Sequence, residues 1–272
     1  MEIKDIYKTN GAPAFVPDPE YDLWWAIVSE KTGRAMQIFM QARSSGRLFE
    51  MRKEELIRLK GVNEKTAAHI LYGRDHWNRE QVLEWMHKDR IRFVPFYDPL
   101  YPRRLLQTDA HPFALFVKGK LPDENKPAVG VIGARECSEY GRGVAEYFGR
   151  ELALAGVNVL SGMALGIDGI SQMAALKAGG VSFAILGCGP DLCYPASNRK
   201  LYELLQNRGG VISEYGPRIG ASSWHFPARN RILAGMSDLI LVVEARGKSG
   251  TLITVDQALD MGKEVMVVPG RI

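Results

Sequence analysis

The 272-residue sequence contains no apolar run near the roughly 20 residues that a membrane-spanning helix needs. Its N-terminal residues lack the basic and apolar regions of a signal peptide, so we expect a cytoplasmic protein with no membrane partner. The cysteines number three, an odd count that argues against a disulfide framework. Cys188 and Cys193 have no second ligand pair near them to complete a zinc site. We therefore expect neither a metal nor any other cofactor.

The motifs of common nucleotide-binding enzymes are also missing. Gly133 is followed by Ala134 and Arg135, so the G-x-G-x-x-G dinucleotide fingerprint is absent. Residues 247–249 (GKS) lack the leading glycine of a Walker P-loop. His225 is the only histidine after residue 126, and no serine–histidine or cysteine–histidine pairing is evident. These absences favour a binding protein over an enzyme.

The charge is positive but not concentrated in a basic block. The net charge is +4 at neutral pH. Residues 1–126 carry 21 Lys/Arg and 18 Asp/Glu (21 − 18 = +3), and residues 127–272 carry 14 and 13 (14 − 13 = +1). A nucleic-acid site would therefore have to be a local cluster of cations.

The second half of the chain alternates between apolar strands and helices. We expect strands at residues 129–132, 157–160, 182–186, 211–212, 239–243 and 265–268. Helices are expected near residues 141–155, 168–178, 198–207, 228–236 and 251–261. Short apolar strands alternating with helices predict an α/β fold, a Rossmann-like, doubly wound and mostly parallel sheet covered on both faces.

The first half of the sequence lacks this alternation of strands and helices. Residues 1–90 are mostly helical in pattern and predict a small SAM-like or helix-hairpin-helix domain. Residues 91–126 begin with a stretch rich in proline and aromatics, which we interpret as a connecting segment packed on the main domain, residues 127–272. Within the helical part, residues 59–70 resemble a DNA-binding hairpin, with Asn63 where a second glycine usually falls. Asparagine tolerates a positive φ, so the turn could be kept, but a bundle turn used for packing fits as well.

Loops that follow the strands are the candidate binding residues. In a doubly wound sheet, ligands lie outside the carboxyl ends of the strands, where loops lead into helix N-termini. The loops at residues 133–141, 161–168, 187–198 and 246–251 are rich in glycine, which lets a phosphate approach the backbone. Arg135 follows the first strand, where it could reach a phosphate or pair with Glu136 or Glu139. Asp168 is expected to cap its own helix.

The segment from Phe226 to Gly235 contains two arginines and an asparagine at a loop-to-helix junction. Arg229 and Arg231 could bind phosphates bidentately, or could pair with carboxylates of the fold. The aromatic residues before them offer a surface for stacking bases. Phosphate or nucleic-acid binding is the leading interpretation.

Taken together, these loops resemble the DprA/Smf family of bacterial DNA-processing proteins. The resemblance runs from about residue 97 to the end. It rests on Tyr101-Pro102, Tyr140-Gly141, the blocks at 161–168, 186–191 and 194–198, Ser213-Glu214, and the blocks at 226–235, 243–245, 249–254 and 268–270.

The resemblance implies a Rossmann-like protein that binds single-stranded DNA, dimerises, and loads the RecA recombinase during natural transformation. It implies a DNA groove formed by Arg135, Lys200, Asn230 and Arg231, with backbone from Gly133, Gly162 and Gly166. The loops add Ala134, Ser249 and Gly250, with Phe226 and Tyr194 as candidate base-stacking rings.

Two departures from the family pattern matter. Ala134 replaces a serine that is common in the first loop. The sequence also stops at residue 272, where many relatives continue through more Rossmann-domain sequence and often a winged-helix module, so we expect a domain truncated at its C-terminus.

One alternative is an enzyme. The chain resembles, more distantly, phosphoribohydrolases that cleave nucleoside monophosphates, but Thr254 stands where their loop carries a glutamate. Glu214 and Glu244 would be the only carboxylates at the sheet edge suited to acid–base chemistry. A protein that shapes double-stranded DNA is a third alternative, disfavoured because no long basic stripe exists to follow a duplex.

Overall fold

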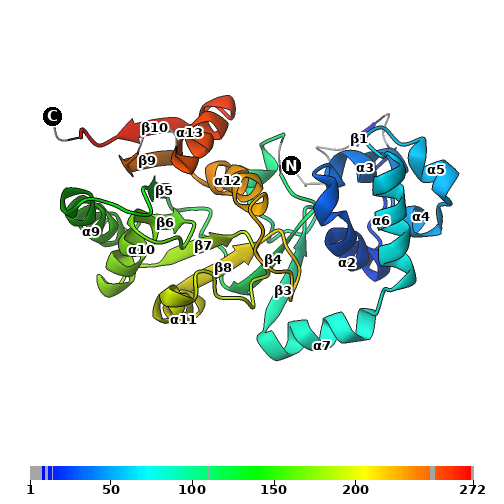
Figure 1. Ribbon diagram of the computed structural model, residues 1–272, viewed down its shortest axis with the longest axis horizontal. Coiled ribbons are helices and arrows are strands. Elements are labelled where there is room, and N and C mark those ends of the chain that lie inside the picture. Colours follow the sequence, from blue (N-terminus) through cyan, green and yellow to red (C-terminus); the bar gives the residue numbers. More distant parts are fainter. Residues whose placement is uncertain (1–7, 10–11, 14, 110, 246–248, 271–272) are drawn as a thin grey trace.

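The computed structural model describes residues 8–9, 12–13, 15–109, 111–245 and 249–270. A group of helices packs beside an α/β part built on one large sheet (Figure 1). The eight-stranded sheet has the order β10-β9-β5-β6-β7-β8-β4-β3. Strands from β10 to β8 run parallel to their neighbours, and β4 and β3 are antiparallel. The predicted α/β, Rossmann-like, mostly parallel sheet is confirmed.

Strands and helices of the α/β part lie close to their predicted positions. The strands are β5 (Ala128–Gly133), β6 (Asn158–Ser161), β7 (Ser182–Leu186), β8 (Gly209–Ser213), β9 (Leu239–Glu244) and β10 (Glu264–Val267). The helices are α9 (Glu139–Leu154), α10 (Ile167–Lys177), α11 (Arg199–Arg208), α12 (His225–Met236) and α13 (Gly250–Asp260), with a short 3-10 helix η2 (Ala196–Asn198) before α11. Apolar side chains on both faces of these strands explain why helices cover both sides.

Separate apolar clusters on its two faces show how the sheet is covered. Val131, Val159 and Val243 face α9 and α10 in one apolar cluster. Ile132 and Val242 face the opposite side, in the cluster that contains α12. Figure 1 shows α9, α10 and α11 on one side of the strands, with α12 and α13 on the other. Successive residues of β5 and of β9 thus alternate between two buried faces.

The segment 91–126 contributes two strands to the sheet. β3 (Ile91–Pro95) pairs with β4 (Ala114–Gly119), which pairs with β8, and α8 (Arg103–Leu106) lies between β3 and β4 in sequence. Phe96 and Phe113 are fully buried against Phe39 of the helical part. The stretch interpreted as a connection therefore extends the sheet and joins it to the helices through aromatic packing.

The helical part lies before β3. It comprises α2 (Pro19–Val28), η1 (Ser29–Thr32), α3 (Ala35–Ala42), α4 (Ser45–Glu50), α5 (Lys53–Ile57), α6 (Glu64–Asp75) and α7 (Arg79–Asp89), with two short strands, β1 (Lys8–Thr9) and β2 (Ala12–Pro13). Trp24 and Trp25 are completely buried here, as expected for rings that fill a small core. No helix in the described ranges is both long and apolar enough to cross a bilayer.

The hairpin turn between α5 and α6 is held against α3. Gln41 on α3 bonds both the N–H and the carbonyl of Lys60, at 2.7 and 3.0 Å. Asn63 does not take the positive φ that we considered for it. Its φ is −102°, and its side chain caps α6 by accepting from the Thr66 N–H at 2.9 Å. A capping asparagine requires extended backbone, which is the physical reason for the difference.

Candidate nucleic-acid interface

The order of the strands creates a crevice between β5 and β9. From β5 the chain adds β6, β7 and β8 on one side, and then returns across the sheet to place β9 on the other side of β5. The loops after β5 and β9 therefore diverge at the carboxyl edge, which is where doubly wound proteins bind ligands. Residues 246–248 of the predicted loop after β9 lie outside the described residues.

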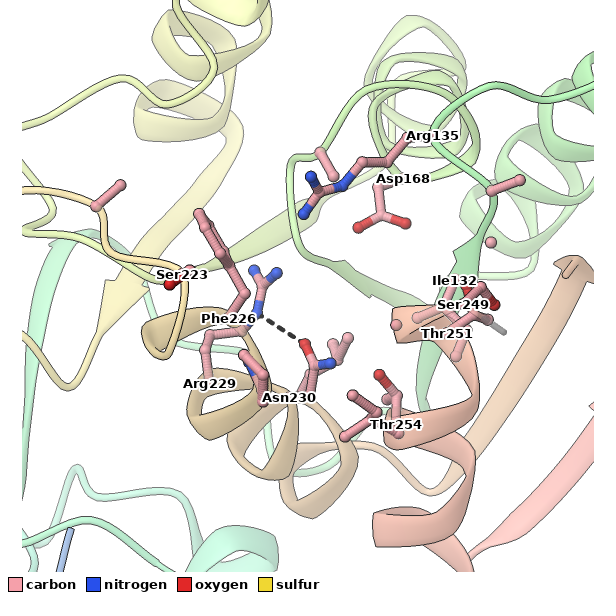
Figure 2. Close-up of a pocket in the computed structure, with 18 of the residues that line it drawn as sticks. Ile132, Arg135, Asp168, Ser223, Phe226, Arg229, Asn230, Ser249, Thr251 and Thr254 are labelled. Atoms are coloured by element: carbon pink, nitrogen blue, oxygen red, sulfur yellow. Dashed lines mark hydrogen bonds between the residues drawn. The ribbon is translucent and has the colours of Figure 1, made fainter. Parts of the chain in front are cut away.

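A cavity of about 790 Å³ lies at this crevice. It is bounded by the loop after β5, the first turns of α12 and α13, and the loop that precedes α12 (Figure 2). Its lining includes Gly133, Ala134, Arg135, Glu136, Asp168, Tyr194, Ser222, Ser223, Phe226, Pro227, Arg229, Asn230, Ser249, Gly250, Thr251 and Thr254. The site is thus built from loops far apart in sequence that the sheet brings together.

Arg135 and two rings form one wall of the cavity. The Arg135 guanidinium carbon lies 5.5 Å from the centre of the Phe226 ring. Tyr194 stacks on Phe226 with ring centres 5.5 Å apart and 30° between the planes. Arg135 is exposed and makes no ion pair with a described residue; Glu139 pairs instead with Arg142. A planar cation over an aromatic face remains available to an anion beside the ring.

Arg229 is buried and anchors the floor of the cavity. Its Nη1 donates to the carbonyls of Gly162 (3.0 Å) and Ile185, at the ends of two adjacent strands. The Asp168 carboxylate faces the same loop and accepts from the Gly162 N–H at 3.1 Å. Burial raises the pKa of the Asp168 carboxyl and lowers the pKa of Arg229, while the charge of each partner opposes the change in the other.

Contrary to the expectation from the sequence, Asp168 does not cap its own helix. The N-cap of α10 is Gly166, and no side chain caps that helix. Asp168 lies inside the first turn, where its carboxylate is turned toward the buried Arg229 guanidinium. The loop between β6 and α10 is therefore held at Gly162, whose N–H donates to Asp168 and whose carbonyl accepts from Arg229. An added Cβ at Gly162 would lie 2.6 Å from Arg229 Nη1 and 2.7 Å from Asp168 Oδ2.

Arg229 also orients Asn230. Its Nε donates to Asn230 Oδ1 at 3.1 Å, the contact drawn as a dashed line in Figure 2. Because the amide oxygen is engaged, the Nδ2 donors of Asn230 are left unbound by any described residue at the cavity. The arrangement presents hydrogen-bond donors to a ligand.

The start of α13 supplies further donors. Ser249 is its N-cap residue, and the Ser249 hydroxyl is buried without a hydrogen-bond partner among the described residues. The Leu252 N–H bonds back to the Ser249 carbonyl, whereas the N–H groups of Gly250 and Thr251 point out of the first turn with no described acceptor. A helix N-terminus with unused donors attracts anions through these groups and the helix dipole.

Most of the predicted binding residues meet at this cavity. Gly133, Ala134, Arg135, Asn230, Ser249, Gly250, Phe226 and Tyr194 all line it. Gly162 lies behind Arg229 rather than on the surface, and Gly166 and Lys200 line a second depression over α10. Gly166 has φ +71°, and an added Cβ would lie 2.2 Å from the Ala134 carbonyl, so the fold itself requires glycine there.

Arg231 lies away from the cavity, contrary to our expectation for a phosphate ligand. Its Nη2 bonds both oxygens of Glu214, at 2.6 and 2.7 Å. Arg229 and Arg231 are two residues apart on α12, so they face opposite sides of the helix. The alternative role for arginine in this segment, pairing with a carboxylate of the fold, therefore applies to Arg231.

The carboxylates considered for acid–base chemistry are both engaged. Glu214 holds Arg231, and Glu244 accepts from the Ser138 N–H and hydroxyl at the start of α9. Thr254 is buried at the cavity, in the position where the hydrolase alternative needs a glutamate. The cavity offers this alternative no carboxylate at that position.

Several contributors were missed at the sequence level. Ser222 and Ser223, in the loop before α12, line the cavity although no motif marked them. The described residues contain no group of three or more histidine, cysteine, aspartate or glutamate side chains that could hold a metal ion, and Cys137, Cys188 and Cys193 are free thiols. Had the sequence predicted that α12 begins at His225 and not near residue 228, the loop just before it would have been recognised as part of the site.

The fold is that of a Rossmann-like protein, with a cavity lined by an exposed arginine and hydrogen-bond donors at the carboxyl edge of its sheet. The sequence model of the family described as DNA recombination-mediator protein A matches residues 92–272, and the chain belongs to this family. The family's description is that of a recombination mediator.

Curated relatives support this assignment. The chain is 39% identical over 194 residues to protein Smf of Escherichia coli, covering 71% of this chain and 52% of that protein. It is 41% identical over 177 residues to the DNA processing protein DprA of Streptococcus pneumoniae, covering 64% and 62%. The chain thus spans between half and two thirds of the length of these relatives.

Solved structures agree with the fold. The X-ray structure of DprA from S. pneumoniae aligns with a TM-score of 0.78 at 29% identity, covering 94% of this chain and 89% of that one. DNA processing protein A from Helicobacter pylori, in a structure concerned with its single-stranded DNA binding mode, aligns with a TM-score of 0.61 at 27% identity, covering 67% and 82%. The first similarity includes the helical part, because it extends over almost the whole chain.

Proposed function

We propose that this protein binds single-stranded DNA at the cavity between the loops after β5 and β9. The observation that carries the proposal is the Arg135 guanidinium, which lies over the Phe226 ring and makes no ion pair with a described residue. A phosphate bound by Arg135 would bring the attached base beside Phe226 and Tyr194. Phosphate binding and base stacking are the two contacts on which single-strand binders depend.

The donors around the cavity support phosphate binding. Asn230, Ser249 and the first residues of α13 line the same cavity as Arg135, and the Ser249 hydroxyl has no hydrogen-bond partner among the described residues. Their partners would be backbone oxygens, which every nucleotide shares. We therefore expect little sequence preference.

Selectivity for single strands follows from the rings and the shape of the cavity. Phe226 and Tyr194 can stack only on bases that are not already stacked and paired inside a duplex. The recess is lined by one exposed arginine, whereas a duplex needs cations spread along its backbones. The single-stranded DNA binding reported for the H. pylori relative supports the same assignment.

Protection of processed or incoming single strands, loading of RecA onto them in transformation or recombination, and homodimerisation belong to the same proposal. The family description as a recombination mediator supports the RecA role. Loading predicts faster nucleation of RecA filaments on oligo-dT in the presence of the protein. A homodimer predicts twice the monomer mass in sedimentation equilibrium.

The test is fluorescence anisotropy with labelled oligo-dT and a matching duplex across a salt series. We expect selective binding to the single strand, with a log–log salt slope of about −0.7 for each phosphate neutralised. Arg135→Glu should weaken binding to every sequence and make the slope shallower. Arg79→Glu, an exposed charge reversal on α7 away from the cavity, is the matched control and should bind like the wild type.

If Arg135→Glu bound oligo-dT as tightly as the wild type, this cavity would not be part of the DNA-binding site. Absence of oligo-dT binding by the wild type at low salt would refute the function itself. In that case, release of free base from a panel of nucleoside monophosphates would become the assay to run.

A further inference from the structure

A second depression, of about 780 Å³, runs over α10 between α9 and α11. Its floor consists of small and apolar residues of α10, including Gly169, Ile170, Met173 and Ala174. The rim belongs to α9 on one side and to η2 and the start of α11 on the other. These helices cover the face of the sheet opposite α12 and α13 (Figure 1).

Cations surround this depression. Arg142 and Arg150 lie on α9, Lys177 at the end of α10 and Lys200 at the start of α11. Glu146 is the one acidic residue among the described residues that line it. Arg142 and Arg150 are eight positions apart, so about 12 Å of helix separates them along α9. The charges therefore follow the length of the groove.

Neighbouring acids do not hold these cations tightly. Arg142 contacts Glu139 at 3.7 Å and Arg150 contacts Glu151 at 2.7 Å, in pairs whose side chains are largely exposed. Exposed ion pairs contribute little free energy, so a phosphate can replace the carboxylate. Lys200 is exposed and forms no ion pair with a described residue.

The depression adjoins the first cavity. Ala164, in the loop between β6 and α10, lines both. Asn198 holds this loop from the other side, because its Nδ2 donates to the carbonyls of Met163 and Ala164 at 2.9 and 3.2 Å. Ala164 thus forms a backbone ridge between the two recesses, belongs to the lining of both, and is held in place by Asn198.

We propose that a single strand bound at the first cavity crosses this ridge and continues along α10, with phosphates on Arg142, Arg150, Lys177 and Lys200. Tyr147 on α9, which is 55% exposed at the groove, provides a second ring for stacking. The extension rests on the proposed function. It gives Lys200 and Gly166, which lie outside the first cavity, a place on the same DNA path.

The test measures affinity for a series of oligo-dT of increasing length. Wild-type affinity should rise as the strand grows past the first cavity, and Arg150→Glu/Lys177→Glu should lose this gain while binding the shortest oligonucleotides normally. On long strands, the salt slope of the double variant should be shallower by about 1.4, from two phosphate contacts at about 0.7 each. Arg79→Glu serves as the charge control.

Tyr147→Ala separates stacking from charge. It should weaken binding of long oligonucleotides about 5- to 150-fold, the range for one lost stacked base, with the salt slope unchanged. Circular dichroism checks that the exposed substitutions leave the fold intact.

Three results would overturn the extension. The double variant could bind long strands like the wild type, or could lose affinity equally at every length. It could also keep all DNA binding and lose only RecA stimulation, which would identify the groove as a protein-docking surface. Failure of the wild type to bind any oligo-dT is a distinct outcome, since it refutes the proposed function as a whole.

Discussion

Replacing Arg229 with methionine tests whether the buried Arg229 guanidinium holds the floor of the cavity. Arg229→Met keeps much of the side-chain volume but removes two hydrogen bonds from Nη1 to strand-end carbonyls and the positive charge that acts on Asp168. Each hydrogen bond from a charged donor contributes about 1.5–3 kcal/mol, so the loss of both costs about 3–6 kcal/mol. At about 2–4 °C per kcal/mol, the melting temperature should fall by about 6–24 °C.

Urea unfolding of a double-mutant cycle gives the decisive number. Arg229→Met, Asp168→Asn and the double variant are compared with wild type, and the coupling energy should be about 0.5–3 kcal/mol. Arg79→Met, an exposed control, should change stability by less than about 0.5 kcal/mol. A loss below about 1 kcal/mol for Arg229→Met, with additive effects in the double variant, would refute both the structural role of Arg229 and its coupling to Asp168.

Three further predictions concern stacking, close packing and pH. Phe226→Ala should weaken oligo-dT binding about 5- to 150-fold in anisotropy, and an unchanged affinity would show that no base stacks there. Gly162→Ala places a methyl 2.6 Å from Arg229 Nη1, so it should lower the free energy of unfolding in urea by at least about 1 kcal/mol; a neutral result would contradict the close packing. Burial lowers the pKa of His225 below its ordinary 6.5. As the pH drops below about 6.5, the unfolded chain therefore takes up a proton that the folded chain does not, and the free energy of unfolding should fall. His225→Asn, which can keep a donor to Gly187, should lose less stability between about pH 7.5 and 5.5, and an equal loss would exclude His225 as the source.

The sheet could be predicted because its strands carry a simple signal. The strands β5 to β9 are short and almost wholly buried, and burial on both faces requires largely apolar runs. β3 and β4 carried a weaker signal, since prolines and aromatics surround them and their antiparallel pairing depends on partners far away in the chain. The local sequence of residues 91–126 fits an extended linker as well as an edge strand.

The site could be predicted only as far as loop position allowed. Arg135 follows β5 directly, so its place at the carboxyl edge follows from topology. Which residues of α12 face the cavity depends on the rotation of that helix, which tertiary packing sets. Arg229, Asn230 and Arg231 are adjacent in sequence, yet they are respectively buried, directed to the cavity and paired with Glu214.

Photo-cross-linking of oligo-dT, followed by mass spectrometry of the attached peptides, tests the central claim most directly. Phe226 and Tyr194 are the rings that line the first cavity, so cross-links should fall on peptides that contain them, and should disappear in Arg135→Glu at a salt concentration where wild type is bound. Cross-links confined to the α2–α7 region, and unaffected by Arg135→Glu, would contradict a DNA site at the carboxyl edge of the sheet.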